Sequence, residues 1–524
     1  MKKYLFILLA GTLLLHCQTR QYDTIIINGS VLDGTGHEAI KTDIGIIGDQ
    51  IVKIGDLKSA KATTVIDATG LTISPGFIDL HAHIEPLMRL PESESHVRQG
   101  ITTALGGPDG SGPWPLGKYL DSLQSFQLGM NVGYLTGHNT IRRNIMKLEN
   151  RAPTTDELEQ MKAQVSQAMS EGAFGISTGL KYLPGTFSEV GEVIALSKVA
   201  ADAKGFYTSH LREEGLGLIE AVKEAIVIGK EANIPIVLTH HKAIGTKMWG
   251  SSVRTLQLVD SARGEGIDVM IDQYPYTASS TGLAVLIPSW AMAGGSEDFK
   301  KRVDNKILRD SIRQGIIFNI LNDRGGGDLS RIQFAGVSWM KELEGKTLKD
   351  FCDLRKLAPT PENGADLVIE VQLSGGASCI FHAIDENDVR NIMKHPMTMI
   401  ATDGRLVKPG DGHPHPRSYG TFPRVLGHYV REEKVLTLPE AIHKMTALPA
   451  IRMGLLDRGI IAEGLKADIV VFNAETVIDK ATFEDPHQYP VGIEYVLVNG
   501  VITVDKGVFT SNRGGRVLYG PNKK

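Results

Sequence analysis

The chain has 524 residues, which exceeds an average domain and fits one α/β barrel with a smaller domain beside it. Hydrophobic residues make up 42% of the sequence and charged residues 22%, a balance that excludes a disordered chain and is typical of a globular protein. The net charge of −4, with Lys and Arg scattered along the chain, provides no basic stripe and excludes nucleic acid as an expected partner.

Residues 1–20 predict an export signal. Two lysines precede an apolar run that ends at Leu15 and is too short to cross a bilayer as a permanent helix. The stretch that ends at Cys17 resembles a bacterial lipobox, although His16 stands where a small residue is usual. We therefore expect an exported bacterial protein, either soluble in the periplasm or anchored to the membrane by a lipid on Cys17. An uncleaved anchor is the third alternative.

Residues 21–73 predict a small all-β unit, because short strands such as Thr24–Asn28 and Gln50–Ile54 are separated by turns. A similar texture returns in residues 456–524, for example in Ile493–Asn499. Neither end supplies enough strands to bury a core alone. We therefore expect both ends to build one small β-sandwich.

Residues 74–455 between these ends predict a (β/α)₈ barrel. Buried strand-like runs alternate with amphipathic helices, which is the pattern of a parallel sheet with helical crossovers. We expect helices over Thr155–Glu171, Glu189–Lys204 and Gly217–Ala232. Residues 282 to about 374 interrupt the alternation with a long, charged, mostly helical insertion. We interpret it as a lid or subdomain over the barrel mouth.

Polar side chains end most of the predicted barrel strands. The carboxyl ends of these strands meet at the active face of a (β/α)₈ barrel. His81 and His83 end the first strand and, at i and i+2, point to the same side of it. The other strand ends are followed by Asp109, His138, Lys181, Tyr182, His210, His240 and Asp403. A single histidine after a strand is most often structural, so the prediction depends on several strand ends agreeing.

Four histidines with one or two carboxylates predict a site for one or two divalent metal ions, most naturally zinc. Such an ion lowers the pKa of a bound water towards roughly 7 and polarises a carbonyl, so we expect hydrolysis of an amide or related acyl bond. Asp403 is the candidate catalytic residue. An ionised carboxylate beside the metal can take the proton of the water and return it to the leaving amine.

The order of the sequence blocks resembles the amidohydrolase superfamily and, within it, the D-aminoacylases (N-acyl-D-amino-acid deacylases). The resemblance covers nearly the whole mature chain. It depends on the blocks Pro75–His83, Ser177–Gly185, Tyr207–Gly215, Thr239–Lys242, Asp272–Tyr276, Met399–Gly404, His415–Arg424 and Gly459–Phe472. The later blocks distinguish this branch from ureases, hydantoinases and dihydroorotases, which share the barrel and the first histidine pair.

The resemblance implies two metal positions. His210 and His240 would hold the more tightly bound ion, while the second position is lined by His81, His83 and Asp403. His241, directly after His240, would then be a supporting or structural residue.

The resemblance also implies substrate contacts. Tyr182, Lys242 and Arg417 match positions of the family that touch the substrate. A free α-carboxylate requires a cation, and Arg can bind it with two hydrogen bonds. Tyr276 either lines the acyl pocket or packs in the core.

Asp109 is a departure from the family pattern, because close relatives carry a metal-binding cysteine after the second strand. A carboxylate can bind or bridge zinc, with weaker selectivity for soft metals. The Pro-Asp-Gly setting is equally typical of a plain turn, and both interpretations stay open. Lys181 is a rival candidate for the bridging ligand, since a carbamylated lysine bridges the metals in other amidohydrolases. His138 is either a hydrogen-bond donor near the water or a buried histidine that orders its loop.

The leading hypothesis is a zinc-dependent hydrolase of N-acyl-D-amino acids. The enzymatic alternative is a dipeptidase or a cyclic-amide hydrolase, and the contrasting class is a non-catalytic envelope lipoprotein that binds a ligand. The retained histidines with Asp403 argue against the last of these. We expect a small N-acyl amino acid or peptide-like substrate, and no pattern specifies an oligomeric state. Cys352 and Cys379 either pair or stay free thiols.

Overall fold

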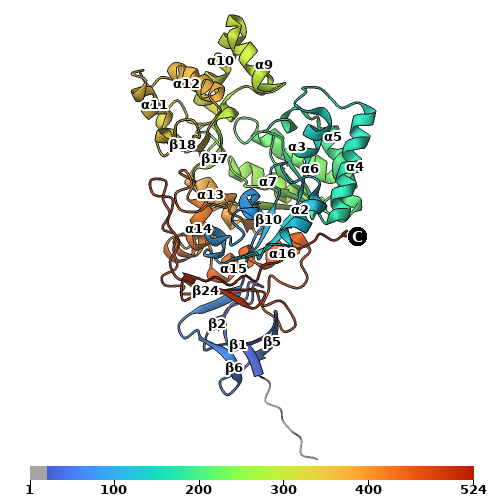
Figure 1. The fold of residues 1–524 in the computed structure, drawn as a ribbon, viewed down its shortest axis with the longest axis vertical. Helices are drawn as coiled ribbons and strands as arrows, with labels where there is room; N and C mark the ends of the chain where they lie inside the picture. The colour runs from blue at the N-terminus through green and yellow to red at the C-terminus, as the bar shows by residue number, and fades with distance from the viewer. Residues whose placement is uncertain (1–20) are drawn as a thin grey trace, which may run out of the picture.

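The computed structural model describes residues 21–524, so the predicted signal and Cys17 lie outside the described residues. Figure 1 shows three parts stacked along the long axis: a small β domain at the bottom, a barrel in the middle and the insertion at the top. Within residues 21–524, no helix is both long and apolar enough to cross a bilayer.

Parallel strands build the barrel in the middle of the molecule. One run of neighbours contains β8 (Phe77–Asp79), β10 (Ile101–Gly106) and β11 (Asn131–Tyr134). The second contains β12 (Thr136–Gly137), β13 (Gly175–Gly179), β14 (Phe206–His210), β15 (Ile236–Leu238), β16 (Val269–Gln273) and β20 (Thr398–Ile400). The chain passes directly from β11 to β12, which together act as one barrel strand. The last strand returns to the first, where Asp403 N donates to His81 O at 2.9 Å. The predicted (β/α)₈ barrel is therefore confirmed.

Helices cover the outside of the barrel where their sequences are amphipathic. The helices are α2 (Leu116–Leu123), α3 (His138–Met146), α4 (Thr155–Glu171), α5 (Val190–Asp202), α6 (Leu218–Ala232), α7 (Ser252–Gly264), α13 (Glu386–Lys394), α15 (Leu438–Met445) and α16 (Ala447–Met453). α4 begins at a capping box between Thr154 and Glu157 and ends at Gly172, whose φ is +111°. α6 buries Leu218 and Val222 against the strands.

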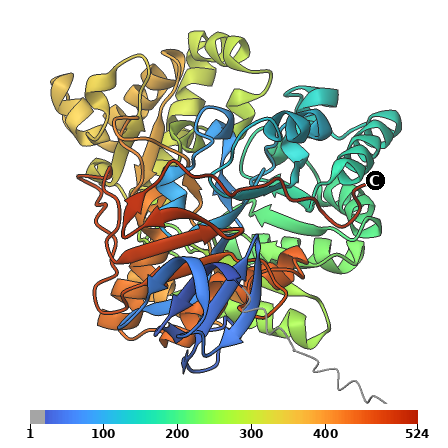
Figure 2. The same cartoon turned by 60° about the horizontal axis from the view of Figure 1, so that its bottom comes forward.

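The small β domain draws strands from both ends of the chain. Its four-stranded sheet has the order β5 (Gln50–Gly55), β4 (Asp43–Ile47), β1 (Gln21–Ile27) and β6 (Lys61–Asp67). Its seven-stranded sheet has the order β25 (Val508–Phe509), β24 (Val501–Asp505), β23 (Ile493–Val498), β22, β7, β2 (Ser30–Val31) and β3 (Ile40–Lys41). The two ends join where β7 (Thr72–Pro75) runs antiparallel to β22 (Ile469–Phe472). Figure 2 shows the N-terminal strands in blue beside the C-terminal strands in red. The expected β-sandwich shared by both ends is confirmed.

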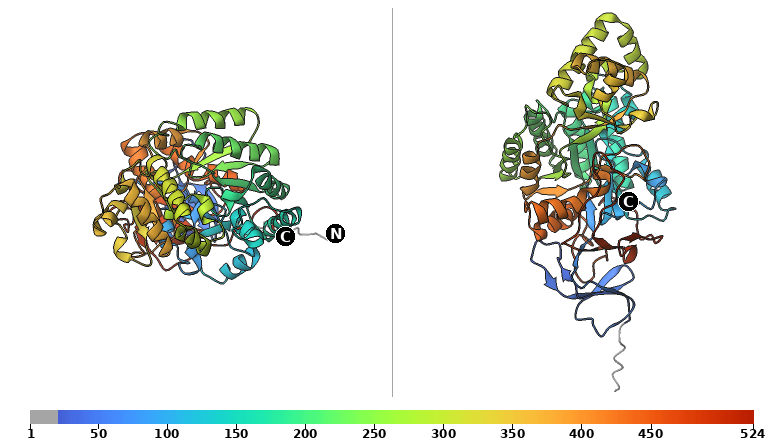
Figure 3. Two further views of the ribbon diagram at one scale, coloured as in Figure 1. Left: turned by 90° about the horizontal axis from the view of Figure 1, so that it is seen from above. Right: turned by 90° about the vertical axis from the view of Figure 1, so that its left-hand side faces the viewer.

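The insertion forms its own layer with its own core. A three-stranded sheet of β17 (Ser279–Gly282), β19 (Ser378–Phe381) and β18 (Ile332–Gly336) carries the helices α8 (Ser289–Met292), α9 (Ser296–Asp304), α10 (Lys306–Asn322), α11 (Leu348–Leu354) and α12 (Pro361–Leu373). Figure 3 (right) shows this layer at the end of the molecule opposite the β domain. Cys352 and Cys379 are buried in this core as free thiols, so the possible disulfide is wrong.

Candidate metal centre

A cavity of about 1300 Å³ opens at the carboxyl ends of the barrel strands. Its floor includes the predicted residues His83, Asp109, His210, His240 and Asp403. The insertion contributes the opposite wall through residues that include Thr281, Arg324 and Gly376. The insertion therefore forms one wall of the cavity at the barrel mouth, and the polar strand ends lie at the bottom of a deep, partly open cavity.

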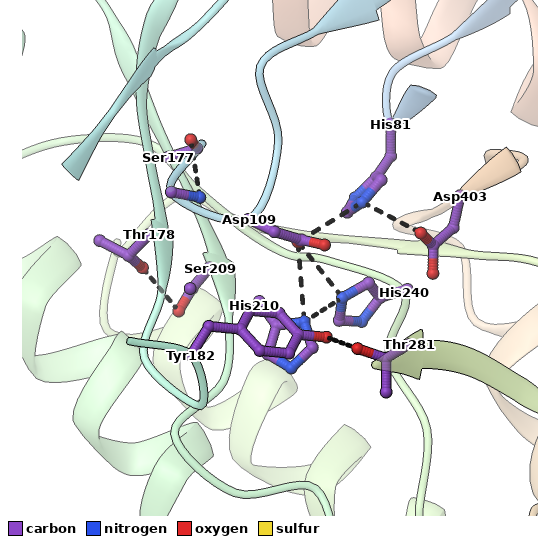
Figure 4. Close-up of polar contacts among 12 residues, drawn as sticks. His81, Asp109, Ser177, Thr178, Tyr182, Ser209, His210, His240, Thr281 and Asp403 are labelled. Carbon is purple, nitrogen blue, oxygen red and sulfur yellow. Dashed lines mark hydrogen bonds and ion pairs between the residues drawn. The ribbon is translucent and has the colours of Figure 1, made fainter. Parts of the chain in front are cut away.

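The predicted ligands gather into two groups that share Asp109. His81, His83, Asp109 and Asp403 form one group, and Asp109, His210 and His240 form the other; in each, the possible ligand atoms lie within 4.8 Å of one another. Figure 4 shows the carboxylate of Asp109 between the histidines of the two groups. The six residues come from five different strand ends of the chain and meet only because the barrel closes.

Asp403 belongs to the first group through close contacts with both histidines of the first strand. Its Oδ1 atom lies 3.2 Å from His83 Nε2 and 3.5 Å from His81 Nε2. In the second group, His210 Nδ1 and His240 Nε2 are only 2.7 Å apart. Two imidazole nitrogens at this distance must share a proton or bind a common cation, because two lone pairs repel.

Three residues of the cluster sit on left-handed backbone at strand ends. The φ angles are +54° at Asp109, +37° at His240 and +46° at Asp403. Residues other than glycine rarely adopt this region, and doing so costs about 1–3 kcal/mol each. The left-handed backbone conformation directs each of these side chains away from the strand and into the cavity.

The donor atoms of the cluster fit a divalent metal ion. Both ring nitrogens of His81, Oδ1 of Asp109 and Nε2 of His210 are buried without a hydrogen-bond partner among the described residues. Each such atom costs about 1–3 kcal/mol when left unsatisfied. Imidazole nitrogen and carboxylate oxygen are ligands of zinc and its first-row neighbours, so a bound ion satisfies the atoms that the protein leaves unpaired.

The electrostatics of the cluster favour a cation. Burial by itself lowers the pKa of His81, but the carboxylates of Asp109 and Asp272 raise that pKa to about 10. Burial raises the pKa of Asp403, yet the Arg417 guanidinium and the nearby histidines hold that pKa below its usual value. Asp403 is therefore ionised at neutral pH. An acid/base residue that must first accept a proton has to be in this state.

The comparisons with known proteins agree with this geometry. The profile of the Amidohydrolase family matches residues 64–278 and 360–504. The chain belongs to the amidohydrolase family. It is 36% identical over 520 residues to the N-acyl-D-glutamate deacylase of Alcaligenes xylosoxydans xylosoxydans, with 95% of this chain and 96% of the relative covered. It is 34% identical over 530 residues to the D-aminoacylase of the same organism, with 95% of this chain and 98% of the relative covered.

A solved structure is similar over the same span. The N-acyl-D-glutamate deacylase from Bordetella bronchiseptica, complexed with zinc and a phosphonate inhibitor that mimics the tetrahedral intermediate, matches with a TM-score of 0.81 at 33% identity. The match covers 95% of this chain and 100% of that chain. The resemblance to the amidohydrolases and D-aminoacylases that the sequence blocks indicated is confirmed.

Two carboxylates that sequence reasoning missed support the histidines of this amidohydrolase. Asp272 Oδ1 accepts a hydrogen bond from His240 N at 2.5 Å, and its Oδ2 faces His81 Nδ1 at 3.7 Å. Glu214 Oε1 lies 3.1 Å from His240 Nδ1. Carboxylates behind metal-binding histidines orient the rings and raise their basicity. Both residues lie inside blocks that carried the resemblance, which was the available signal.

The cations predicted to bind the substrate line the cavity, but each is paired with a carboxylate of the protein. Arg417 Nη1 donates to Asp403 Oδ2 at 2.7 Å. Lys242 Nζ donates to Glu214 and, at 2.7 Å, to His240 O. A substrate carboxylate must therefore share these cations with the protein. Arg324, a buried cation from the insertion, lines the same cavity and was missed because nothing in its local sequence points to the barrel.

Tyr182 and Tyr276 have different surroundings. The Tyr182 ring lies 4.4 Å from the ring of His210, and its hydroxyl accepts from Thr281 Oγ1 at 3.0 Å, on the cavity wall. Tyr276 does not line the large cavity and packs against His415 at 5.1 Å. It also lines a small second cavity with His240 and Lys242. Of the two interpretations of Tyr276, packing agrees with the structure, and the acyl-pocket role stays a prediction.

Lys181 does not reach the ligand groups. Its ammonium lies 2.6 Å from Glu213 and 3.6 Å from Asp323. The bridging carbamate is therefore wrong, because these carboxylates hold the side chain away from the histidines, and Asp109 occupies the shared position instead.

His138 and His241 have structural partners. His138 Nε2 lies 2.7 Å from Glu192 of α5, and His241 Nε2 lies 2.8 Å from Thr255 of α7. Neither ring belongs to the ligand groups. His138 is a buried histidine that ties the end of the third strand to a helix.

Proposed function

We propose that this amidohydrolase is a zinc-dependent deacylase that cleaves the amide bond of N-acyl-D-amino acids. The observation that carries the proposal is the pair of histidine groups sharing Asp109, with ionised Asp403 at their edge, on the floor of a deep cavity. The names of the similar proteins, which act on N-acyl-D-glutamate and other D-amino acid derivatives, support the substrate class.

The residues of the cluster would hold zinc as two histidine pairs with Asp109 and Asp403. Zinc, when bound, lowers the pKa of a water towards roughly 7 and polarises the substrate carbonyl. Asp403 takes the proton of the attacking water on its carboxylate and delivers it to the nitrogen of the leaving amino acid. Arg417 holds Asp403 in place through the 2.7 Å hydrogen bond and keeps it ionised between turnovers.

The cavity wall supplies the groups that bind the substrate and limits the access of water. Arg417 and Lys242 present positive charge close to the cluster, which favours a substrate with a free α-carboxylate over a cyclic ureide. The insertion lines the barrel mouth through Thr281 and Arg324, so it limits the access of bulk solvent to the reacting amide from that side.

A substrate panel tests the proposal. The zinc-loaded protein should release the amine from N-acyl-D-amino acids faster than from their L enantiomers. Asp403→Asn should lower kcat by about 10²–10⁴-fold with an unchanged circular dichroism spectrum. Asp121→Asn, an exposed carboxylate on α2, is the matched control and should retain full activity. The proposal is wrong if no member of a panel of N-acyl amino acids and dipeptides is turned over.

We also propose that the protein is exported, on the basis of residues 1–20. Cell fractionation should find it outside the cytoplasm, and Cys17→Ser should abolish incorporation of a labelled fatty acid. A full-length protein in the cytoplasm with its N-terminus intact would contradict export. Export without label on Cys17 would leave only the soluble periplasmic alternative.

A further inference from the structure

Asp109 is held by a turn with little conformational freedom. The turn follows β10, and Gly107, Asp109 and Gly110 all have left-handed φ angles of +75°, +54° and +74°. Glycine adopts this region at no steric cost, whereas aspartate does so only when its surroundings enforce it. The surroundings therefore select the direction of the Asp109 side chain.

Ser177 of the neighbouring strand β13 ties the two ends of this turn together. Its hydroxyl donates to Gly107 O at 2.6 Å and accepts from Gly110 N at 3.1 Å. Figure 4 shows the Ser177 side chain on the side of the turn that faces away from the histidines. Gly179 of the same strand packs directly against the turn, because a Cβ added at Gly179 would lie only 2.2 Å from Asp109 O. Asp109 is thus clamped by its neighbouring strand.

The Oδ1 atom of Asp109 lies between the two histidine pairs. It is 3.4 Å from His240 Nε2, 3.7 Å from His210 Nδ1 and 3.5 Å from His81 Nε2, whereas Oδ2 lies 3.5 Å from His83 Nε2. Asp109 is buried, and its Oδ1 has no hydrogen-bond partner among the described residues. A rigid, buried carboxylate whose Oδ1 atom contacts histidines of both pairs has the geometry of a shared ligand.

The ligand groups contain no thiolate. Both cysteines of the described chain lie in the core of the insertion, so the cluster offers only imidazole nitrogen and carboxylate oxygen. Thiolates select zinc and other soft ions, whereas carboxylate oxygen, which Asp109 and Asp403 supply, also suits Mn²⁺. We infer that Asp109 is a ligand shared by both metal positions, that Ser177 positions it, and that the centre takes Mn²⁺ alongside Zn²⁺. The inference rests on the metal site of the proposed function.

Metal binding to the full chain tests the inference without any substrate. The metal-free protein should bind two Mn²⁺ per chain by elemental analysis, and the electron paramagnetic resonance spectrum should show two spin-coupled ions. Asp109→Asn should lose the coupling and at least one ion. Asp109→Cys should retain Zn²⁺ but bind Mn²⁺ more weakly, because the donor becomes soft.

Ser177→Ala tests the positioning role. It should weaken Mn²⁺ binding by about 10–100-fold, as removal of a group that orients a ligand does, and should lower kcat at saturating metal less than at limiting metal. Thr178→Val is the matched control, because the Thr178 hydroxyl bonds to Tyr207 at 2.8 Å and not to the turn. It should leave Mn²⁺ affinity unchanged.

Several results would overturn the inference. These are two coupled Mn²⁺ ions in Asp109→Asn, a single Mn²⁺ in the wild type, or equal Mn²⁺ affinity in Ser177→Ala and the wild type. If Asp109→Asn fails to fold, Asp109→Cys and Ser177→Ala still decide the question. A protein that binds two coupled Mn²⁺ but hydrolyses no N-acyl amino acid would contradict the proposed function and support this inference.

Discussion

The buried ion pair behind the third barrel strand gives a prediction whose size follows from the structure. Glu192 of α5 accepts a hydrogen bond from Arg142 Nη1 and faces His138 at 2.7 Å, and all three side chains are almost fully buried. Glu192→Gln keeps the shape but removes the charge, which leaves the Arg142 guanidinium buried without a counter-ion. Breaking a buried pair in this way costs about 3–5 kcal/mol.

The loss of stability caused by Glu192→Gln should depend on pH. Burial raises the pKa of Glu192, but the hydrogen bonds and charges of His138 and Arg142 lower this pKa by more than burial raises it. The pKa of Glu192 in the folded protein is therefore below its usual 4.5. A carboxylate with a depressed pKa stabilises the fold above its unfolded pKa, and this contribution is lost as pH falls through the folded pKa. The difference between wild type and Glu192→Gln should be full at pH 7 and should shrink below about pH 4.5.

Urea unfolding of the metal-loaded proteins at pH 7 and at pH 4 measures this difference, and elemental analysis measures their metal content. The double variant Glu192→Leu with Arg142→Met should recover part of the lost free energy, because no buried charge remains unpaired. If Glu192→Gln unfolds at the wild-type urea concentration, the pair contributes no stability. If its metal content falls instead, His138 belongs to the metal site and the reasoning is refuted.

Three further predictions concern the site and the insertion. Asp272→Ala should weaken metal binding by about 10–100-fold, measured by chelator competition, because Asp272 accepts the hydrogen bond from His240 N that positions this ligand; unchanged affinity would show that the hydrogen bond is dispensable. Gly179→Ala should displace the Asp109 turn and lower metal content, whereas Gly191→Ala on α5, where an added Cβ meets nothing within 4 Å, should not; equal metal content in both would contradict the clamp. Dithiothreitol should leave the unfolding temperature unchanged, because both cysteines are free thiols; a drop would reveal a disulfide.

Much of the architecture was predictable because it depends on local patterns. Alternation of buried strands with amphipathic helices predicts a barrel wherever it occurs, and the expected helix Thr155–Glu171 matches α4 residue for residue. The ligands His81 and His83 were also predictable, since their spacing and strand position place both imidazoles on one face. The order of the blocks then sufficed for the family.

Other features depended on where side chains point once the barrel closes. Asp109 and Lys181 both follow strands, yet only Asp109 reaches both histidine pairs, because a left-handed turn aims it inward while Glu213 and Asp323 hold Lys181 away. Residue spacing locates a strand end but does not determine the dihedral angles of the turn after it.

The sequence by itself determined the barrel, the shared β domain and the set of strand ends from which the metal ligands come. Only the tertiary structure decided that Asp109 is common to both groups, that Tyr276 packs in the core, and that Asp272 and Glu214 support the histidines. The physical reason is that local periodicity fixes secondary structure, whereas contacts between strands far apart in sequence depend on the packing of turns around them.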